Sequence, residues 1–288
     1  METSELIQKV RKIEIKTRGL SKNIFAGEYH SAFKGRGMTF AEVREYQYGD
    51  DIRSIDWNVT ARFGHPYIKV FEEERELTVV LLIDVSGSRE FGTVSQLKKD
   101  IFTEVAATLA FSTIQNNDKI GVIFFSDKIE KFIPPKKGKK HVLHIIRELI
   151  DFQPESKQTD IGGALRYLTN AIKKSSTAFL ISDMIDKNFD KELNIVARKH
   201  DLVALQVYDI RETELPDVGL IKLKDAESGE RIWVDTSDKR LRISYKHAWG
   251  QNQLELQKTF TKSGVEMVSM STSEDYVRAL MKLFKMRA

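Results

Sequence analysis

The chain contains no cysteine among its 288 residues. Disulfide bonds, thiolate nucleophiles and cysteine-ligated metal sites are therefore excluded. A chain without cysteine suits a reducing compartment, so we expect a cytoplasmic protein. Proline is also scarce, with 5 residues, and glycine contributes only 16, which argues against a collagen-like or linker-dominated chain.

Long hydrophobic runs are missing as well. No apolar stretch reaches the ~18 residues that a membrane-spanning helix needs. The N-terminal segment METSELIQKVRKIEIKTRG also lacks the uninterrupted apolar run of a secretory signal. We therefore expect no membrane span. Peripheral association of the basic N-terminal helix with an anionic membrane surface stays open.

The net charge is small, at +4 from 46 basic and 42 acidic residues. Residues 1–36 hold eight Lys/Arg and four Asp/Glu, so the surplus is concentrated there. A charge this low for the length does not indicate nucleic-acid binding, and we expect no nucleic-acid partner. The rival reading, binding through the basic N-terminus, would require an affinity that falls steeply with salt.

From residue 76 onward, short apolar runs alternate with longer segments of helical period. The runs predict strands buried on both faces, over 78–84, 119–125, 177–183, 202–208 and 265–270. Helices are predicted over 93–115, 141–152, 160–173 and 189–200. A last helix opens with the capping-box pattern of Ser271 and Glu274. This alternation indicates an α/β fold, with a mostly parallel sheet and helices on both faces.

Two segments interrupt the alternation. Residues 211–245 hold two strand-like runs around a Ser-Gly turn, which predicts a β-hairpin insertion. Residues 1–75 form a separate N-terminal region that begins with a helix ending near Gly19 and is not expected to fold alone. Residues 76–288 are then expected to form one α/β domain that carries the hairpin.

Polar side chains lie where the predicted strands end. Asp84, Ser86 and Ser88 follow the first core strand at a spacing of two, Thr159 precedes a predicted helix, and Asp183 ends the run 177–183. Ligands of open α/β sheets bind beyond the carboxyl ends of the strands. Carboxylate and hydroxyl oxygens are the donors that Mg²⁺ or Mn²⁺ prefers. The combination predicts a divalent-metal site, although each motif taken singly also suits a helix cap or turn.

The five residues together resemble the metal-ion-dependent adhesion site of von Willebrand factor A domains. The resemblance implies that Ser86, Ser88 and Thr159 supply hydroxyl ligands. It implies that Asp84 and Asp183 act through bound water or through hydrogen bonds to the ligands. An ion held by neutral hydroxyls keeps an open position that attracts a carboxylate from another protein.

A block near the N-terminus makes the resemblance more specific. It consists of FAEVREY at 40–46, YGDDIRSIDW at 48–57 and TAR at 60–62. The block is similar to the signature of a bacterial family, the domain-of-unknown-function family number 58. Members of that family join such a block to a von Willebrand A-like domain, and the resemblance covers nearly the whole chain. It implies a MoxR-type AAA+ ATPase partner, other von Willebrand A-domain proteins as further partners, and a role in chaperone-like maturation or cofactor insertion.

Two details remain open at this level. Many von Willebrand A domains have glycine where this chain has Met184, so the shape of that loop is a point of departure. Residues 39–76 mix aromatic and charged side chains, which favours a structural lid whose aromatics are buried while its charges pair. The alternative is a docking face for the ATPase, with exposed Arg and Trp as anchors.

We predict a non-enzymatic interaction module with a divalent-metal site. The alternative is a metal-dependent phosphohydrolase, in which Asp84 would accept a phosphoryl group as in haloacid-dehalogenase-like sheets. Against this, Ser86 stands where such an enzyme requires an acid/base aspartate. In addition, no histidine or lysine is expected close enough to the site to act as a general base.

Overall fold

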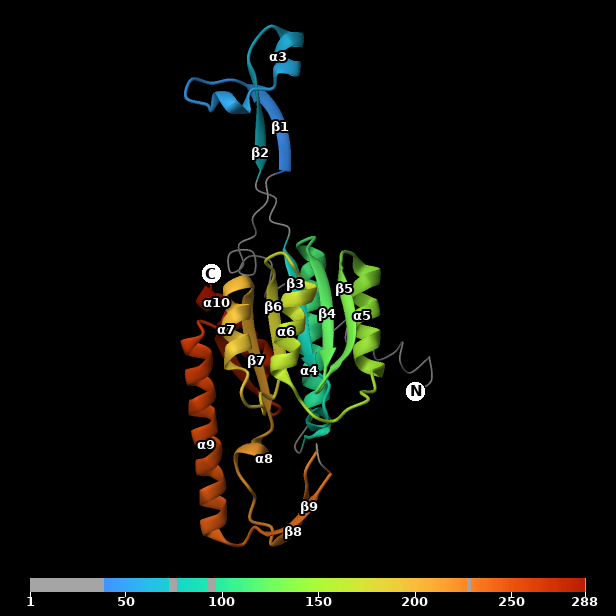
Figure 1. The fold of residues 1–288 in the computed structure, drawn as a ribbon, viewed down its shortest axis with the longest axis vertical. Helices are drawn as coiled ribbons and strands as arrows, with labels where there is room; N and C mark the ends of the chain where they lie inside the picture. The colour runs from blue at the N-terminus through green and yellow to red at the C-terminus, as the bar shows by residue number, and fades with distance from the viewer. Residues whose placement is uncertain (1–38, 73–76, 93–96, 227–228, 288) are drawn as a thin grey trace. The chain divides into compact units, whose positions relative to one another are not determined.

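The computed structural model describes residues 39–72, 77–92, 97–226 and 229–287 (Figure 1). The chain divides into two compact units, with the division at Leu77 and Thr78. The predicted N-terminal helix before Gly19 lies outside the described residues. None of the helices in the described ranges combines the length and the apolarity required to cross a bilayer.

The smaller unit is an antiparallel β-hairpin with two short helices in its connection. Its elements are β1 (Thr39–Glu45), η1 (Ile52–Ser54), α3 (Trp57–Phe63) and β2 (Tyr67–Glu72). Asp56 begins α3, because its side chain accepts hydrogen bonds from the backbone N–H groups of Asn58 and Val59.

Charged side chains of the smaller unit pair with one another. The guanidinium of Arg44 lies 2.7 Å from the carboxylate of Asp50, and its hydrogen bond holds the pKa of Asp50 below the usual value. Tyr48, Ile52 and Trp57 are exposed within this unit. Whether residues 39–76 act as a lid or as a docking face stays a prediction.

The larger unit is built on a six-stranded sheet in the order β10-β7-β6-β3-β4-β5 (Figure 1). Its strands are β3 (Thr78–Asp84), β4 (Lys119–Phe125), β5 (Ile129–Lys136), β6 (Thr177–Ser182), β7 (Asp201–Tyr208) and β10 (Glu266–Ser271). All neighbours pair in parallel except β5, which runs antiparallel to β4. The predicted mostly parallel α/β sheet is confirmed.

One strand of the six-stranded sheet, β5, was not predicted from the sequence, and neither were β1 and β2 of the smaller unit. The run that forms β5 contains Pro134 and Pro135, which cannot donate to a ladder of hydrogen bonds. Proline is tolerated at the edge of a sheet, where one side of the strand has no neighbour. The edge position of β5 therefore explains why a proline-containing run can still be a strand.

Helices cover both faces of the sheet. One face packs against α6 (Ile161–Ala171), α7 (Asp190–Lys199) and the end of α9 (Lys239–Lys262). The other carries α4 (Lys98–Gln115), with α5 (Lys139–Asp151) and α10 (Tyr276–Arg287) beside it. The predicted start of the last helix is wrong. Ser271 stays extended because it pairs with Tyr208 at the end of β10, and the Asp275 side chain accepts the N–H of Val277 instead.

The insertion between β7 and β10 contains the predicted hairpin and a long helix. The hairpin consists of β8 (Leu220–Lys224) and β9 (Arg231–Asp235), and α8 (Ile210–Thr213) precedes it. The 24 residues of α9 were not predicted as a helix. Its apolar residues do not form one stripe, and Ile243 and Leu254 remain exposed, while Phe260 near its end is buried in the core.

Buried His200 is expected to make folding sensitive to acid. Its Nδ1 lies 2.8 Å from the Ser176 hydroxyl, and burial, with Lys199 nearby, lowers its pKa from 6.5 to about 4. Between these pH values His200 is protonated in the unfolded chain but neutral in the folded chain. The contribution of His200 to the free energy of unfolding should therefore fall as the pH falls from about 6.5 towards 4, whereas the raised pKa of buried Asp84 acts in the opposite direction.

Urea denaturation at several pH values measures this effect. His200→Asn removes this contribution, so the difference in stability between the wild type and the variant should shift against the wild type as the pH is lowered through that window. The matched control is His144→Asn, whose side chain is 51% exposed and should leave the profile unchanged. An identical pH profile for His200→Asn and the wild type would contradict the assignment.

Candidate metal centre

Asp84 is the last residue of β3 and is 1% exposed. One of its carboxylate oxygens accepts the backbone N–H of Ser86 at 2.9 Å, and the other accepts the hydroxyl of Ser182 at 2.7 Å. Ser182 ends β6, the parallel neighbour of β3, so the two residues meet at the carboxyl edge of the sheet. The carboxylate is therefore oriented by two adjacent strands.

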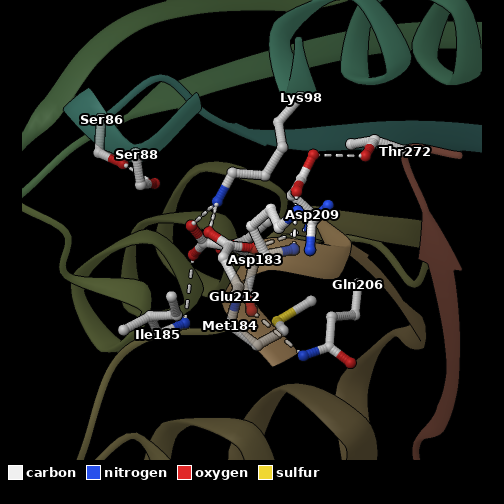
Figure 2. A network of polar contacts seen from close by, with 12 residues as sticks. Ser86, Ser88, Lys98, Asp183, Met184, Ile185, Gln206, Asp209, Glu212 and Thr272 are labelled. Carbon is white, nitrogen blue, oxygen red and sulfur yellow. Dashed lines mark hydrogen bonds and ion pairs between the residues drawn. The ribbon is translucent and has the colours of Figure 1, made fainter. Parts of the chain in front are cut away.

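The hydroxyl oxygens of Ser86 and Ser88 lie 3.1 Å apart in the loop that follows β3 (Figure 2). Ser86 is fully buried and Ser88 is half-buried. Two hydroxyl oxygens at this separation form a pair of hard donors.

Thr159 lies in the loop that enters α6, and it is half-buried. Two backbone hydrogen bonds tie this loop to the same edge of the sheet. The N–H of Gly87 donates to the carbonyl of Lys157, and the N–H of Asp160 donates to the carbonyl of Ser126, which follows β4. The structure thus brings Asp84, Ser86, Ser88 and Asp183 into one neighbourhood and fastens the Thr159 loop beside them.

Asp183 follows β6 and is 1% exposed. One oxygen of its carboxylate accepts the backbone N–H of Ile185, and its carbonyl accepts the side-chain amide of Gln206. The other oxygen lies 2.8 Å from the ammonium of Lys98. Figure 2 shows this ammonium pointing to the carboxylates of Asp183 and Glu212.

Lys98 is the residue that sequence reasoning missed. Its side chain is 0% exposed, and its ammonium also lies 2.5 Å from the carboxylate of Glu212. The expectation that no lysine lies near the site is therefore wrong. Lys98 is the first residue of α4, where the helix dipole disfavours a cation. A lysine in the first turn of a helix was the signal available, but Lys99 stands in the same turn, and nothing in the sequence indicates which of the two is buried.

The charges of the cluster are unbalanced towards negative. Burial first, and the charge of Asp183 second, raise the pKa of Asp84 to about 7. Burial also raises the pKa of Glu212. Burial disfavours the Lys98 ammonium, but Asp183 and Glu212 outweigh this and raise its pKa. Lys98 thus pairs with two of the three carboxylates, and the buried guanidinium of Arg89 is a second cation that interacts with Asp84. Three carboxylates and two cations leave one negative charge when all the carboxylates are ionised, which favours an additional cation.

The residues present fit a divalent ion that is held by hydroxyl oxygens. Within the described ranges, no group of three or more His, Cys, Asp or Glu side chains could hold a metal. An ion at this edge would depend on the hydroxyls of Ser86 and Ser88, with the carboxylates of Asp84 and Asp183 balancing its charge. The uneven charge of the cluster and the paired hydroxyls are both consistent with that donor set.

The loop after Asp183 keeps the backbone geometry that glycine favours. Met184 has a φ of 61°, in the left-handed region, and its side chain is 4% exposed within the core. Its backbone N–H donates to the hydroxyl of Ser182 at 3.0 Å. The departure from glycine therefore does not change the type of turn. It replaces a permissive residue with one that is strained but buries its side chain.

Comparisons with known proteins agree with this architecture. The family model described as "Protein of unknown function DUF58" matches residues 42–255. The uncharacterized protein Rv1480 of Mycobacterium tuberculosis is 28% identical over 98% of this chain and 90% of its own length. The conserved hypothetical protein BatB of Bacteroides thetaiotaomicron has a similar structure, with a TM-score of 0.50 and 15% identity over 73% of this chain and 98% of that one.

A further structural match is the VWA domain of SpRpn10. It has a TM-score of 0.38 and 13% identity, and it covers 73% of this chain and 94% of that one. The similarity to BatB supports the α/β fold of the larger unit, with its mostly parallel sheet and helices on both faces.

Removing the buried ammonium should strongly destabilise the fold. Lys98→Met leaves Asp183 and Glu212 facing each other without a cation, which is expected to cost about 3–5 kcal/mol in the free energy of unfolding. Urea denaturation in the presence of a chelator measures this cost. Added Mg²⁺ should stabilise the variant more than the wild type, because the ion replaces the lost positive charge.

Lys128→Met is the matched control. The Lys128 ammonium also lies 2.5 Å from a carboxylate, that of Glu155, but this pair is exposed, with side-chain exposures of 49% and 78%. Exposed pairs contribute little, so the control should shift the denaturation midpoint far less. Equal shifts in the denaturation midpoint for Lys98→Met and Lys128→Met would show that the Lys98 ion pairs stabilise the fold no more than an exposed ion pair does.

Met184→Gly tests which of two opposing effects dominates. Glycine relieves a left-handed strain of about 1–2 kcal/mol. It also removes a buried side chain from the core, which costs about 2–5 kcal/mol when methionine is truncated. We expect net destabilisation in thermal denaturation. A higher melting temperature would show that relief of the backbone strain outweighs the loss of the buried side chain.

Proposed function

The chain belongs to the DUF58 family, and we propose that it is a non-enzymatic protein-interaction module whose divalent-ion site docks a partner. One observation carries the proposal: the paired hydroxyls of Ser86 and Ser88 lie beside the buried carboxylates of Asp84 and Asp183. The DUF58 match and the von Willebrand A-like fold support the same reading.

The residues of the site would have two different roles in binding the ion. Ser86, Ser88 and Thr159 would hold the Mg²⁺ or Mn²⁺ ion, while Asp84 and Asp183 balance its charge. When bound, the ion offers an open position that attracts a carboxylate. The buried carboxylates are already oriented by neighbouring strands and by hydrogen bonds, so little reorganisation is needed on binding.

The partner that the family resemblance favours is a MoxR-type AAA+ ATPase, acting with this chain in the cytoplasm in chaperone-like maturation or cofactor insertion. Such a machine would supply the work of ATP hydrolysis. The sequence of this chain contains no G-x-x-x-x-G-K-[ST] loop of its own.

The presence of Lys98 at the site removes one reason for rejecting an enzyme, but Lys98 is not suited to act as a general base. A lysine does lie at the site, but its raised pKa keeps it protonated, so it does not serve as a general base. Both carboxylate oxygens of Asp84 accept hydrogen bonds and the residue is 1% exposed. Such a carboxylate is poorly suited to attack a phosphoryl group.

Metal binding can be measured with Mn²⁺ by electron paramagnetic resonance. Ser88→Ala removes one of the paired hydroxyls and should weaken Mn²⁺ binding by about tenfold or more, a loss of ~1.4 kcal/mol. Ser273→Ala is the matched control, because its hydroxyl pairs at 2.9 Å with that of Ser271 at the end of another strand of the same sheet. Equal affinities for Ser88→Ala and the wild type would count against the proposed ligand set.

Partner capture tests the docking role. A pull-down from the native host in Mg²⁺ should recover an AAA+ ATPase with the wild-type chain. Asp84→Ala, or the wild type in a chelator, should recover much less of it. Recovery of no ATPase, or equal recovery in all three cases, would overturn the docking proposal. Turnover of a phosphoester that is lost in Asp84→Ala would favour the hydrolase instead.

A further inference from the structure

The β8–β9 hairpin lies next to the candidate metal centre. Its turn contains Ala226, and a Cβ added to Gly87 would lie 2.5 Å from the carbonyl oxygen of Ala226. Gly87 stands between Ser86 and Ser88, so the hairpin turn is in direct contact with the loop that carries the paired hydroxyls. The hairpin turn therefore touches the segment that carries the paired hydroxyls, and Figure 1 shows β8 and β9 beyond the lower end of the sheet.

The register of the hairpin separates its side chains into two faces. Lys222 pairs with Trp233, and Lys224 pairs with Arg231, so these four side chains share one face. All four are exposed, and Trp233 is 64% exposed. The Lys222 ammonium lies 5.5 Å from the centroid of the Trp233 ring. We call these four residues the basic–aromatic face.

The charge of the basic–aromatic face is complementary to an acidic partner. It presents three cations around one large aromatic ring. The next cross-strand pair on the same face is Leu220 with Asp235, and the Asp235 carboxylate already accepts the backbone N–H of Ser237. Exposed tryptophan and arginine side chains are the residue types that most often dominate protein interfaces.

We propose that the basic–aromatic face and the candidate metal centre (Asp84, Ser86, Ser88, Thr159 and Asp183) together bind one acidic segment of a protein partner. The inference rests on the proposed function, because the ion would take one carboxylate of that segment while the hairpin binds the acidic residues that follow it. A protein partner fits better than a nucleic acid, because the face offers a single aromatic ring rather than a row of stacking platforms.

The test uses the full chain and a fluorescein-labelled peptide of about ten glutamates, followed by fluorescence anisotropy in Mg²⁺ at physiological salt. Lys222→Glu/Lys224→Glu should weaken peptide binding by about tenfold or more. Trp233→Ala should weaken it by a similar factor, because truncation of a central anchor is costly. Unchanged melting temperatures confirm that the larger unit stays folded in both variants.

Lys258→Glu/Lys262→Glu is the matched control. It makes the same change in net charge on exposed positions of α9, away from the hairpin register. The control should bind the peptide as the wild type does. An equal loss in the control and the hairpin variant would show non-specific attraction and overturn the inference, as would wild-type binding by the hairpin variant.

Two further arms separate the inference from the proposal on which it rests. If the hairpin variants lose peptide binding while a chelator has no effect, the hairpin binds acidic segments without the metal ion. In that case both the metal-docking proposal and the inference that one segment spans the hairpin and the metal centre fail. If a chelator weakens binding but the hairpin variants do not, the proposed function stands and the inference fails. A labelled single-stranded oligonucleotide that binds through the hairpin when the peptide does not would also overturn it.

Discussion

The buried ammonium of Lys98 is the interaction on which the larger unit depends at its functional edge. It joins the start of α4 to the end of β6 and to α8, elements that are separated by 85 and 114 residues in the sequence. A lysine is rarely found with 0% exposure unless it is paired. Its two carboxylates satisfy the charge, and in doing so they fix where the loop after β6 begins relative to α4.

The same ammonium sets the electrostatics of the candidate metal centre. Without it, three buried carboxylates would repel one another at the edge of the sheet. With it, the repulsion between Asp183 and Glu212 is reduced, while burial first and the charge of Asp183 second still raise the pKa of Asp84. The site is thus held together by an internal cation, and the remaining negative charge still favours an added one. This arrangement would let the edge stay folded with or without a bound ion, so that metal binding would tune docking rather than folding.

The insertion gives this edge a second component. Glu212, which accepts a hydrogen bond from the Lys98 ammonium, also accepts the backbone N–H of Asp209 at the start of α8. The carboxylate of Asp209 in turn accepts the hydroxyl of Thr272 after β10. The start of the insertion is therefore hydrogen-bonded both to the rim of the site and to the segment that follows β10. Its hairpin turn returns to the loop that carries Ser86 and Ser88, at a position where only glycine fits.

The sequence by itself predicted most of the sheet, because runs such as 78–84 and 177–183 are apolar nearly throughout, are short, and alternate with segments of helical period. It also predicted that Asp84 and Asp183 lie close together, since they stand at the ends of strands whose carboxyl ends must meet in a parallel sheet. The sequence did not reveal β5, because its prolines contradict strand propensity and only an edge position tolerates them. It did not reveal α9 either, whose apolar residues lack a common stripe.

Only the tertiary structure decided which side chains gather around those donors. The proximity of Lys98 to Asp183, and of the hairpin turn to Gly87, depends on where the chain returns after long excursions. Local patterns report the periodicity of an element and the chemistry of its ends. Local patterns do not indicate which distant segment packs against that end, because such contacts are fixed by the burial of the whole core.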